Sequence, residues 1–222
     1  MFIHAILPFL LATSASALIT PQKRDTWGGA LSLGPTTSHI ISAETTLVPG
    51  AAPATQNGEL FLWPGMSNGT GDLIQTTLES WPDNSWCGAV SGEWCVRASL
   101  FGSFGQLDAD AGVVKATDEV KIVYTRSADG NVTNAITGAY LSSFSHASGP
   151  MTGWGTGTEC DDNCSGTIAA QVWKNTKITL ASPDTAFSGT LGVSGGTTYT
   201  GLQNSDDGTV WTIDSINVPA MV

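Results

Sequence analysis

Hydrophobic and polar residues alternate along most of this chain with the period of two that is typical of β-strands. The alternating runs are short, and turns rich in Gly, Asn, Asp and Pro separate them, whereas helical periodicity is almost absent. Asp129-Gly130 directly after one run is a strong signal for a tight turn. The pattern predicts one all-β domain, an antiparallel two-sheet β-sandwich of the jelly-roll kind, with its clearest strands at Glu59–Trp63, Asp72–Glu79, Trp94–Leu100, Glu119–Arg126, Ala139–Ser145, Thr167–Lys174 and Val210–Val218.

The first 24 residues are typical of export signals. Residues 1–17 are apolar, end in Ala15-Ser16-Ala17 and are too short to span a bilayer, which predicts a signal peptide; a buried N-terminal strand is the alternative. Residues 18–24 form a predicted pro-segment that ends in the dibasic pair Lys23-Arg24. We therefore expect a secreted, extracellular protein whose single domain covers residues 25–222 and begins at Asp25.

Four cysteines and three glycosylation sequons agree with an oxidising compartment. One cysteine pair brackets a glycine-rich turn and the other an Asp-Asp-Asn turn, so local pairs are the simplest of the three possible connectivities. A zinc site is disfavoured, because no histidine lies near the Cys-x3-Cys spacing. We expect disulfides 87–95 and 160–164, formed by Cys87, Cys95, Cys160 and Cys164, and N-glycosylation at one or more of Asn68, Asn131 and Asn163.

The chain is acidic, with 19 Asp and Glu against 8 Lys and Arg and a net charge of −11. It has no basic patch, which argues against nucleic acid and anionic membranes as partners. We expect a monomer without metal or cofactor. A His-dependent hydrolase is disfavoured, because neither His39 nor His146 lies in a metal-ligand or Gly-x-Ser-x-Gly context. Asp161-Asp162-Asn163 is interpreted as a solvated turn rather than a calcium loop. No segment has the Glu-x-Asp-x-x-Glu arrangement of jelly-roll glucanases.

Two predicted strands each place a glutamine on one face. In Asp72–Glu79, alternation separates Gln75 from the most apolar side chains, and in Thr167–Lys174 it places Gln171 opposite the Ile and Val face. Ordinary solvent-facing strand residues are the alternative interpretation. If both faces line one concave sheet, the two amides meet a ligand there, in a groove whose further predicted residues are Trp63, Thr77, Glu79, Trp81, Trp86 and Trp173.

Eight tryptophans give the chain an unusual supply of flat stacking surfaces. We expect at least half of them in the core. Trp81 and Trp86 flank a loop of Pro, Asp, Asn and Ser, and are the best candidates for exposed contacts. A groove of this kind suits an extended or ring-shaped ligand, which can be a glycan, a peptide or an apolar metabolite.

Several short motifs resemble, in their order, the fungal glutamic peptidases (eqolisins) and their broader concanavalin A-like relatives. The motifs are Trp27-Gly28-Gly29-Ala30, Ser42–Pro49, Phe61–Gly65 and Leu73-Ile74-Gln75, within residues 27 to 80. The resemblance implies a β-sandwich in which a glutamine and a glutamate on neighbouring strands act together. In that family the glutamate activates water as general base, and the glutamine holds the nucleophile and stabilises the oxyanion.

Gln75 matches the family's glutamine, but the segment that best fits its glutamate strand, Ile168–Trp173, has Gln171 instead. An amide cannot take a proton from water, so the general base is missing unless another carboxylate such as Glu79 or Asp214 replaces it. Three functions stay open. We favour a secreted ligand-binding protein without peptidase activity; the others are an enzyme that orients a small apolar metabolite for cyclisation or rearrangement, and an acid glutamic endopeptidase.

Overall fold

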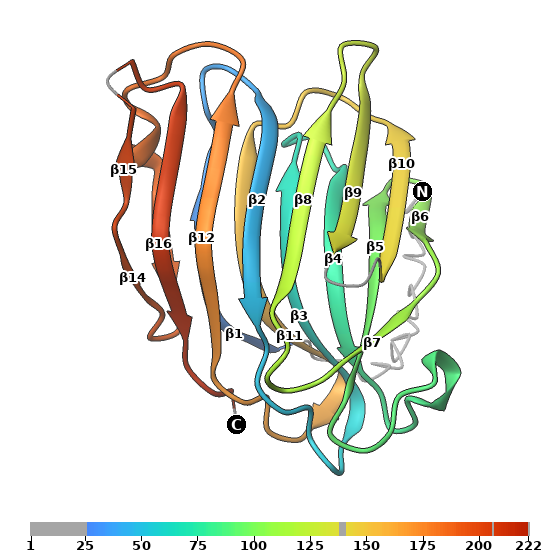
Figure 1. Cartoon of the computed structure of the whole chain (residues 1–222). Coiled ribbons are helices and arrows are strands. Elements are labelled where there is room, and N and C mark those ends of the chain that lie inside the picture. Colours follow the sequence, from blue (N-terminus) through green and yellow to red (C-terminus); the bar gives the residue numbers. More distant parts are fainter. Residues whose placement is uncertain (1–25, 138–140, 206, 222) are drawn as a thin grey trace, which may run out of the picture.

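The computed structural model describes residues 26–137, 141–205 and 207–221. Its strands form two antiparallel sheets packed face to face, which confirms the predicted all-β sandwich (Figure 1). The predicted signal peptide, pro-segment and mature start at Asp25 lie outside the described residues. Among those residues, no helix has the length and apolar character that crossing a membrane requires.

Sheet A lies at the back of Figure 1 and carries the candidate site on its outer face. Its longest strand, β11, has glycines at alternate positions and pairs with β1 on one side and β3 on the other. The strands of sheet A, in order, are β13 (Gly192–Ser194), β1 (Thr26–Leu33), β11 (Gly153–Ser165), β3 (Asn57–Ser67), β4 (Leu73–Ser80), β5 (Trp94–Gly102) and β6 (Gly105–Asp108), with β7 (Gly112–Val114) paired to β5.

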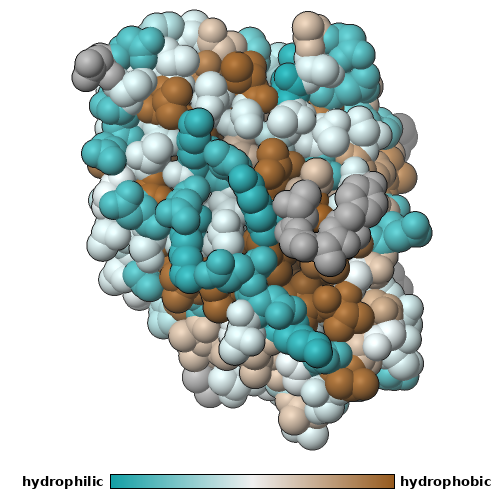
Figure 2. All heavy atoms as spheres, in the orientation of Figure 1, coloured by the Kyte–Doolittle hydropathy of each residue, from teal (hydrophilic) through white to brown (hydrophobic). Residues whose placement is uncertain are grey.

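Sheet B lies at the front, and Figure 2 shows its outer face as largely hydrophilic with scattered hydrophobic patches. Exposed ion pairs such as Lys121–Glu44, at 3.0 Å, cross this face. Two 3-10 helices, η1 (Ser85–Cys87) and η2 (Phe187–Thr190), lie in connections. The strands of sheet B, in order, are β10 (Ser142–Ala147), β9 (Asn131–Thr137), β8 (Val120–Arg126), β2 (Ile40–Val48), β12 (Gln171–Leu180), β16 (Val210–Val218) and β14 (Thr198–Thr200), with β15 (Gln203–Asn204) paired to β16.

The core lies between the sheets and follows from the alternation of side chains. In β4, Ile74 and Leu78 point inward and are completely buried, while Gln75 points outward and is half-buried. Burying each such aliphatic side chain stabilises the fold by about 1.5–3 kcal/mol. Trp94 and Trp173 are also completely buried. Half of the tryptophans are core residues, as expected, because Trp154 and Trp211 join these two.

A buried polar bridge joins the sheets beneath Gln75. The hydroxyl of Tyr124 on β8 donates to the carbonyl oxygen of Pro64 at 2.8 Å, and the amide of Asn134 on β9 donates to the carbonyl oxygen of Gln75 at 2.7 Å. Burial raises the pKa of Tyr124 above its ordinary value, so its hydroxyl stays protonated. The bridge fixes the backbone of β3 and β4 from the core side, directly under the outward side chains of these strands.

Two disulfides join Cys87 to Cys95 and Cys160 to Cys164, which confirms the local pairing. The first ties the loop after β4 to β5, and the second closes the end of β11. Each of the seven predicted strands overlaps an observed one. Thr167–Lys174 is strand only from Gln171, and the strand predicted at 139–145 begins at 142, with residues 138–140 outside the described part.

Candidate functional site

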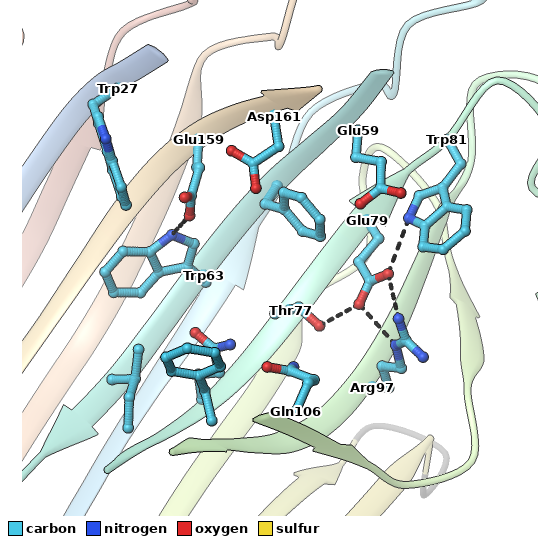
Figure 3. A pocket seen from close by; sticks show the side chains of 14 residues that line it. Trp27, Glu59, Trp63, Thr77, Glu79, Trp81, Arg97, Gln106, Glu159 and Asp161 are labelled. Atoms are coloured by element: carbon cyan, nitrogen blue, oxygen red, sulfur yellow. Dashed lines mark hydrogen bonds and ion pairs between the residues drawn. The ribbon is translucent and has the colours of Figure 1, made fainter. Parts of the chain in front are cut away.

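A pocket of about 570 Å³ opens on the outer face of sheet A (Figure 3). A shallower hollow of about 240 Å³ adjoins it and shares Trp63 and Leu73 with it; together they are called the groove below. The hollow has a floor that includes Gly65, Gly153 and Gly155. The larger pocket is lined by Trp27, Glu59, Phe61, Trp63, Leu73, Gln75, Thr77, Glu79, Trp81, Arg97, Phe101, Gln106, Glu159 and Asp161.

Gln75 lies on the groove floor at a level where neither neighbouring strand carries an acidic residue. The register places Gly65 of β3 and Ser99 of β5 opposite Gln75. One strand further on each side, β11 contributes Gly155 and β6 contributes Asp108 at the same level, and Asp108 forms an ion pair with Arg97 at 2.9 Å. A carboxylate that acts with the Gln75 amide, as the family resemblance implies, is therefore missing from both neighbouring strands at this level.

Glu79 lies on the same strand and face, but all its hydrogen-bonding capacity is engaged. Its side chain is 1% exposed and accepts four hydrogen bonds: two from Arg97 at 2.8 Å, one from the Trp81 indole at 3.1 Å and one from the Thr77 hydroxyl at 2.6 Å. Arg97 also pairs with Asp108 at 2.9 Å. Burial acts to lower the pKa of Arg97, but its bonds to the two carboxylates raise that pKa overall. These residues form a fixed wall of the groove (Figure 3).

Trp63 crosses the groove floor because a glycine leaves it room. A Cβ at Gly157 would lie 3.0 Å from the Trp63 ring, so a larger residue there would displace the indole. The indole N–H donates to Glu159 at 3.1 Å. Trp27 packs edge-on against Trp63, with ring centroids 6.3 Å apart, and stays 62% exposed. The two rings, which are nearly perpendicular to each other, give the groove apolar surfaces beside a carboxylate.

One end of the larger pocket is acidic. Asp161 of β11 stands directly opposite Glu59 of β3 in the antiparallel register, and Glu159 lies two positions away on the same face. Figure 3 shows the three carboxyl groups along one side of the pocket, pointing into it. The described residues include no group of three or more His, Cys, Asp or Glu side chains arranged to hold a metal ion.

The structure places five of the predicted groove residues together: Gln75, Thr77, Glu79, Trp63 and Trp81 all line the larger pocket. Their contact with a ligand stays a prediction. Trp86 is 41% exposed but stands behind this wall, with its ring 5.5 Å from that of Trp81 and 4.9 Å from the guanidinium carbon of Arg97. It supports the wall instead of lining the groove.

The expected meeting of Gln75 and Gln171 is wrong, because the two residues lie in different sheets and face different environments. Gln171 begins β12 of sheet B and is 1% exposed, and its amide donates across the core to the Thr158 hydroxyl at 2.9 Å. Trp173 shares this inward face and is completely buried, so it cannot line the groove either. The face of this strand that carries Gln171 and Trp173 therefore points into the core, opposite to the prediction.

The main residues missed by the sequence reasoning lie on β11. Glu159 and Asp161 point outward, while Trp154, Thr156, Thr158 and Cys160, at the alternate positions of the strand, point inward. The period-two pattern is present in Gly-Trp-Gly-Thr-Gly-Thr-Glu, but glycine is also typical of turns, so the sequence did not predict a strand there. Residues 162–163 are exposed and have positive φ angles of 61° and 54°, as in a solvated turn, although they lie within β11; Asp161 lines the pocket instead.

The three sequons lie at the surface or partly so. Asn163 is exposed between the cysteines at the end of β11, and Asn68 lies half-buried in the loop between β3 and β4. Asn131 is half-buried and donates its amide to Asp129 at 2.9 Å. Glycosylation of these residues stays a prediction.

Comparison with known proteins identifies the fold. No protein-family model matches the chain, and no curated protein matches it. Solved structures do: Scytalido-glutamic peptidase with a peptide-based transition-state analogue is 14% identical, with a TM-score of 0.52 over 87% of this chain and 99% of that chain. SCP-B, a member of the eqolisin family of peptidases in complex with the tripeptide Ala-Ile-His, is 11% identical, with a TM-score of 0.53 over 90% and 100%.

These likenesses span almost the whole of each matched chain, so the sandwich as a unit is eqolisin-like. At such low identity they establish the fold and not the activity. The resemblance inferred from four short motifs is confirmed at the level of the fold.

Proposed function

We propose that this chain is an eqolisin-like protein that binds an extended peptide along the groove of sheet A, without glutamic-peptidase catalysis. The observation that carries the proposal is the level of Gln75, where the neighbouring strands present Gly65 and Ser99. A general base must lie within hydrogen-bonding reach of the water it activates. The other carboxylate on that strand, Glu79, is held by four hydrogen bonds in the wall.

The shape and chemistry of the groove support an extended ligand. The larger pocket and the shallower hollow follow one another past Trp63 and Leu73, which gives an elongated path with a glycine floor at one end. The Gln75 amide offers a donor and an acceptor, which match the N–H and C=O groups of a peptide backbone. The solved relatives hold a peptide-based analogue and a tripeptide, which also favours a peptide.

The same proposal places the protein outside the cell. Two disulfides within one domain are typical of oxidising compartments and rare in the cytosol. The predicted signal peptide and sequons agree with this location. An acidic, disulfide-bonded peptide-binding domain is suited to the extracellular medium.

The test combines a binding assay with a cleavage assay on the purified secreted protein. Capped peptides and neutral oligosaccharides are titrated while tryptophan fluorescence is followed, since Trp63 and Trp81 line the groove. Peptides are expected to change the fluorescence, and Gln75→Met to weaken binding by about 5- to 150-fold, the cost of one lost buried hydrogen bond. Gln203→Met is the matched control, because Gln203 is an exposed glutamine of sheet B; it should leave affinity unchanged.

In the second assay, denatured protein substrates are incubated with the protein at about pH 3–4, where a carboxylate base of a glutamic peptidase works. No cleavage above a heat-inactivated sample is expected. Cleavage that Gln75→Met abolishes would contradict the proposal and restore the glutamic-peptidase hypothesis. Binding of oligosaccharides but no peptides would reassign the groove to glycans.

A further inference from the structure

We propose that Asn134, a core residue of sheet B, is a positioning residue for the Gln75 amide in the groove of sheet A. The inference rests on the proposed function, because it assigns a supporting role at the place where that function puts the peptide. The side chain of Asn134 is completely buried, and its Nδ2 donates to the carbonyl oxygen of Gln75 at 2.7 Å. Asn134 therefore holds the backbone from which the Gln75 side chain projects, without touching the ligand itself.

The orientation of the Asn134 amide is fixed by partners of both of its polar atoms. Its Oδ1 accepts a hydrogen bond from the Thr76 hydroxyl at 3.1 Å, while its Nδ2 binds the Gln75 carbonyl. The Tyr124 hydroxyl lies 3.1 Å from the Thr76 hydroxyl and donates to the Pro64 carbonyl oxygen at 2.8 Å. Each polar group limits the freedom of the next, and a buried network that is satisfied in this way is rigid.

Asn134 interrupts an inward row of β9 that is otherwise apolar. Val132 and Ile136, two positions away on either side, are buried in the same core. Tyr124 stands directly opposite Asn134 in the antiparallel register of β8 and β9, so the two polar side chains are neighbours. An apolar residue would fill such a core position without the cost of burying an amide. The two polar side chains face the level of Gln75 across the sandwich, where the groove offers its amide to the peptide.

The neighbours of Gln75 in its own sheet give its side chain little lateral support. Gly65 of β3 and Ser99 of β5 stand opposite Gln75, and they offer few atoms against which a long side chain can pack. The Ser99 hydroxyl reaches the Gln75 carbonyl only at 3.4 Å, whereas the Asn134 amide reaches it at 2.7 Å. The bond from the core is therefore the stronger side-chain restraint on this backbone. Such support matters for binding, because a displacement of about 1 Å is enough to spoil a hydrogen bond to a ligand.

The test compares Asn134→Leu with Gln171→Met in the full secreted protein. Both changes remove a buried hydrogen bond that crosses the core, but the bond of Gln171 ends on the Thr158 hydroxyl and not on the Gln75 backbone. Both should therefore lower the Tm by a few degrees. Calorimetry then measures the affinity of the tightest-binding capped peptide from the titrations above. We expect Asn134→Leu to weaken binding by about 5- to 30-fold, and Gln171→Met to leave it within about twofold.

A double-mutant cycle shows whether Asn134 acts through Gln75. In the Gln75→Met background, where the amide is absent, Asn134→Leu should weaken binding by no more than about twofold further. A change that only loosens the fold would reduce the affinity by the same factor in both backgrounds.

A second readout needs no ligand. The side-chain amide signal of Gln75 in a nitrogen–proton NMR spectrum is identified by its loss in Gln75→Met. This signal should shift in Asn134→Leu and stay in place in Gln171→Met. If Asn134→Leu does not fold, Asn134→Ser fits the same space and should show the same losses, because its shorter side chain does not reach the Gln75 carbonyl.

The two proposals fail in different ways. An unchanged affinity in Asn134→Leu, an equal loss in Gln171→Met, or a loss that is the same with and without the Gln75 amide would overturn the positioning role while peptide binding stands. An unshifted Gln75 signal in Asn134→Leu would overturn it as well. If no peptide binds the unaltered protein, the proposed function fails, and the amide signal alone decides whether Asn134 positions Gln75.

Discussion

Replacing Arg97 with methionine should expose how much the wall of the groove depends on one ion pair. The change keeps most of the aliphatic stem but leaves the Glu79 carboxylate, which is 1% exposed, without its cation. Breaking a buried pair by removing one partner costs about 3–5 kcal/mol. Arg97 is itself 20% exposed, and Glu79 keeps its bonds from Trp81 and Thr77, so we expect a cost of about 2–4 kcal/mol.

The assay is thermal and urea unfolding of four proteins: the unaltered chain, Arg97→Met, Glu79→Gln and the double variant. For a chain of this size each kcal/mol lowers the Tm by roughly 2–4 °C, so Arg97→Met should unfold about 5–15 °C earlier. Glu79→Gln should cost less, because Arg97 keeps Asp108. The double variant should cost less than the two single changes together, by about 1–3 kcal/mol.

Strictly additive costs would show that the two side chains do not interact in solution. A loss below about 1 kcal/mol for Arg97→Met would mean that the pair is screened like a surface ion pair. Either result would remove the fixed wall from the description of the groove.

Three further predictions concern residues outside the acidic end. Gln171→Met should leave peptide affinity unchanged and shift stability by only about 1 kcal/mol, since Gln171 makes one core hydrogen bond; a loss of binding would contradict its core role. Tyr124→Phe should cost about 1–3 kcal/mol by removing the buried hydroxyl that bonds the Pro64 carbonyl and the Thr76 hydroxyl, and an unchanged Tm would refute the polar bridge. Hydrogen bonds from the Thr36 hydroxyl and a backbone N–H lower the pKa of Asp184, so its stabilisation is complete above the ordinary value of 3.8 and is lost as the pH falls further. Asp184→Asn should therefore destabilise the protein at about pH 6 and progressively less below pH 3.8 in acid titrations of unfolding; an equal loss at about pH 2.5 would contradict the assignment.

Alternation alone was enough to orient the strand of Gln75. In Asp72–Glu79 two of the three apolar residues, Ile74 and Leu78, fall on one face, whereas the other face combines Leu73 with the polar set of Gln75, Thr77 and Glu79, so the inward face can be predicted. The local disulfides could also be predicted from the sequence, because the cysteines of each pair lie only 8 or 4 residues apart. Wherever one face of a strand is clearly more apolar than the other, alternation alone predicts which side chains point into the core.

For the strand of Gln171 the same reasoning gave the wrong inward face, and the reason is physical. Both of its faces are substantially apolar, and the inward one can hold Gln171 because the Thr158 hydroxyl, which β11 supplies from the opposite sheet, accepts a hydrogen bond from its amide. A partner that folding brings across the sandwich leaves no trace in the local pattern. The acidic end of the groove was missed likewise, because Asp161 and Glu59 become neighbours only through strand pairing.

The glycines on the outer face of β11 have an evolutionary consequence. A Cβ at Gly155 would lie 3.0 Å from the Leu31 carbonyl oxygen and 3.3 Å from the Ser32 Cβ, so a side chain there needs shifts of only a few tenths of an ångström. Because a single base change can convert a glycine codon into a glutamate codon, a carboxylate at the level of Gln75 is one mutational step away. A single Gly155→Glu change would therefore add a carboxylate to the groove floor at the level of Gln75, two strands away, while the rest of the scaffold remains the same.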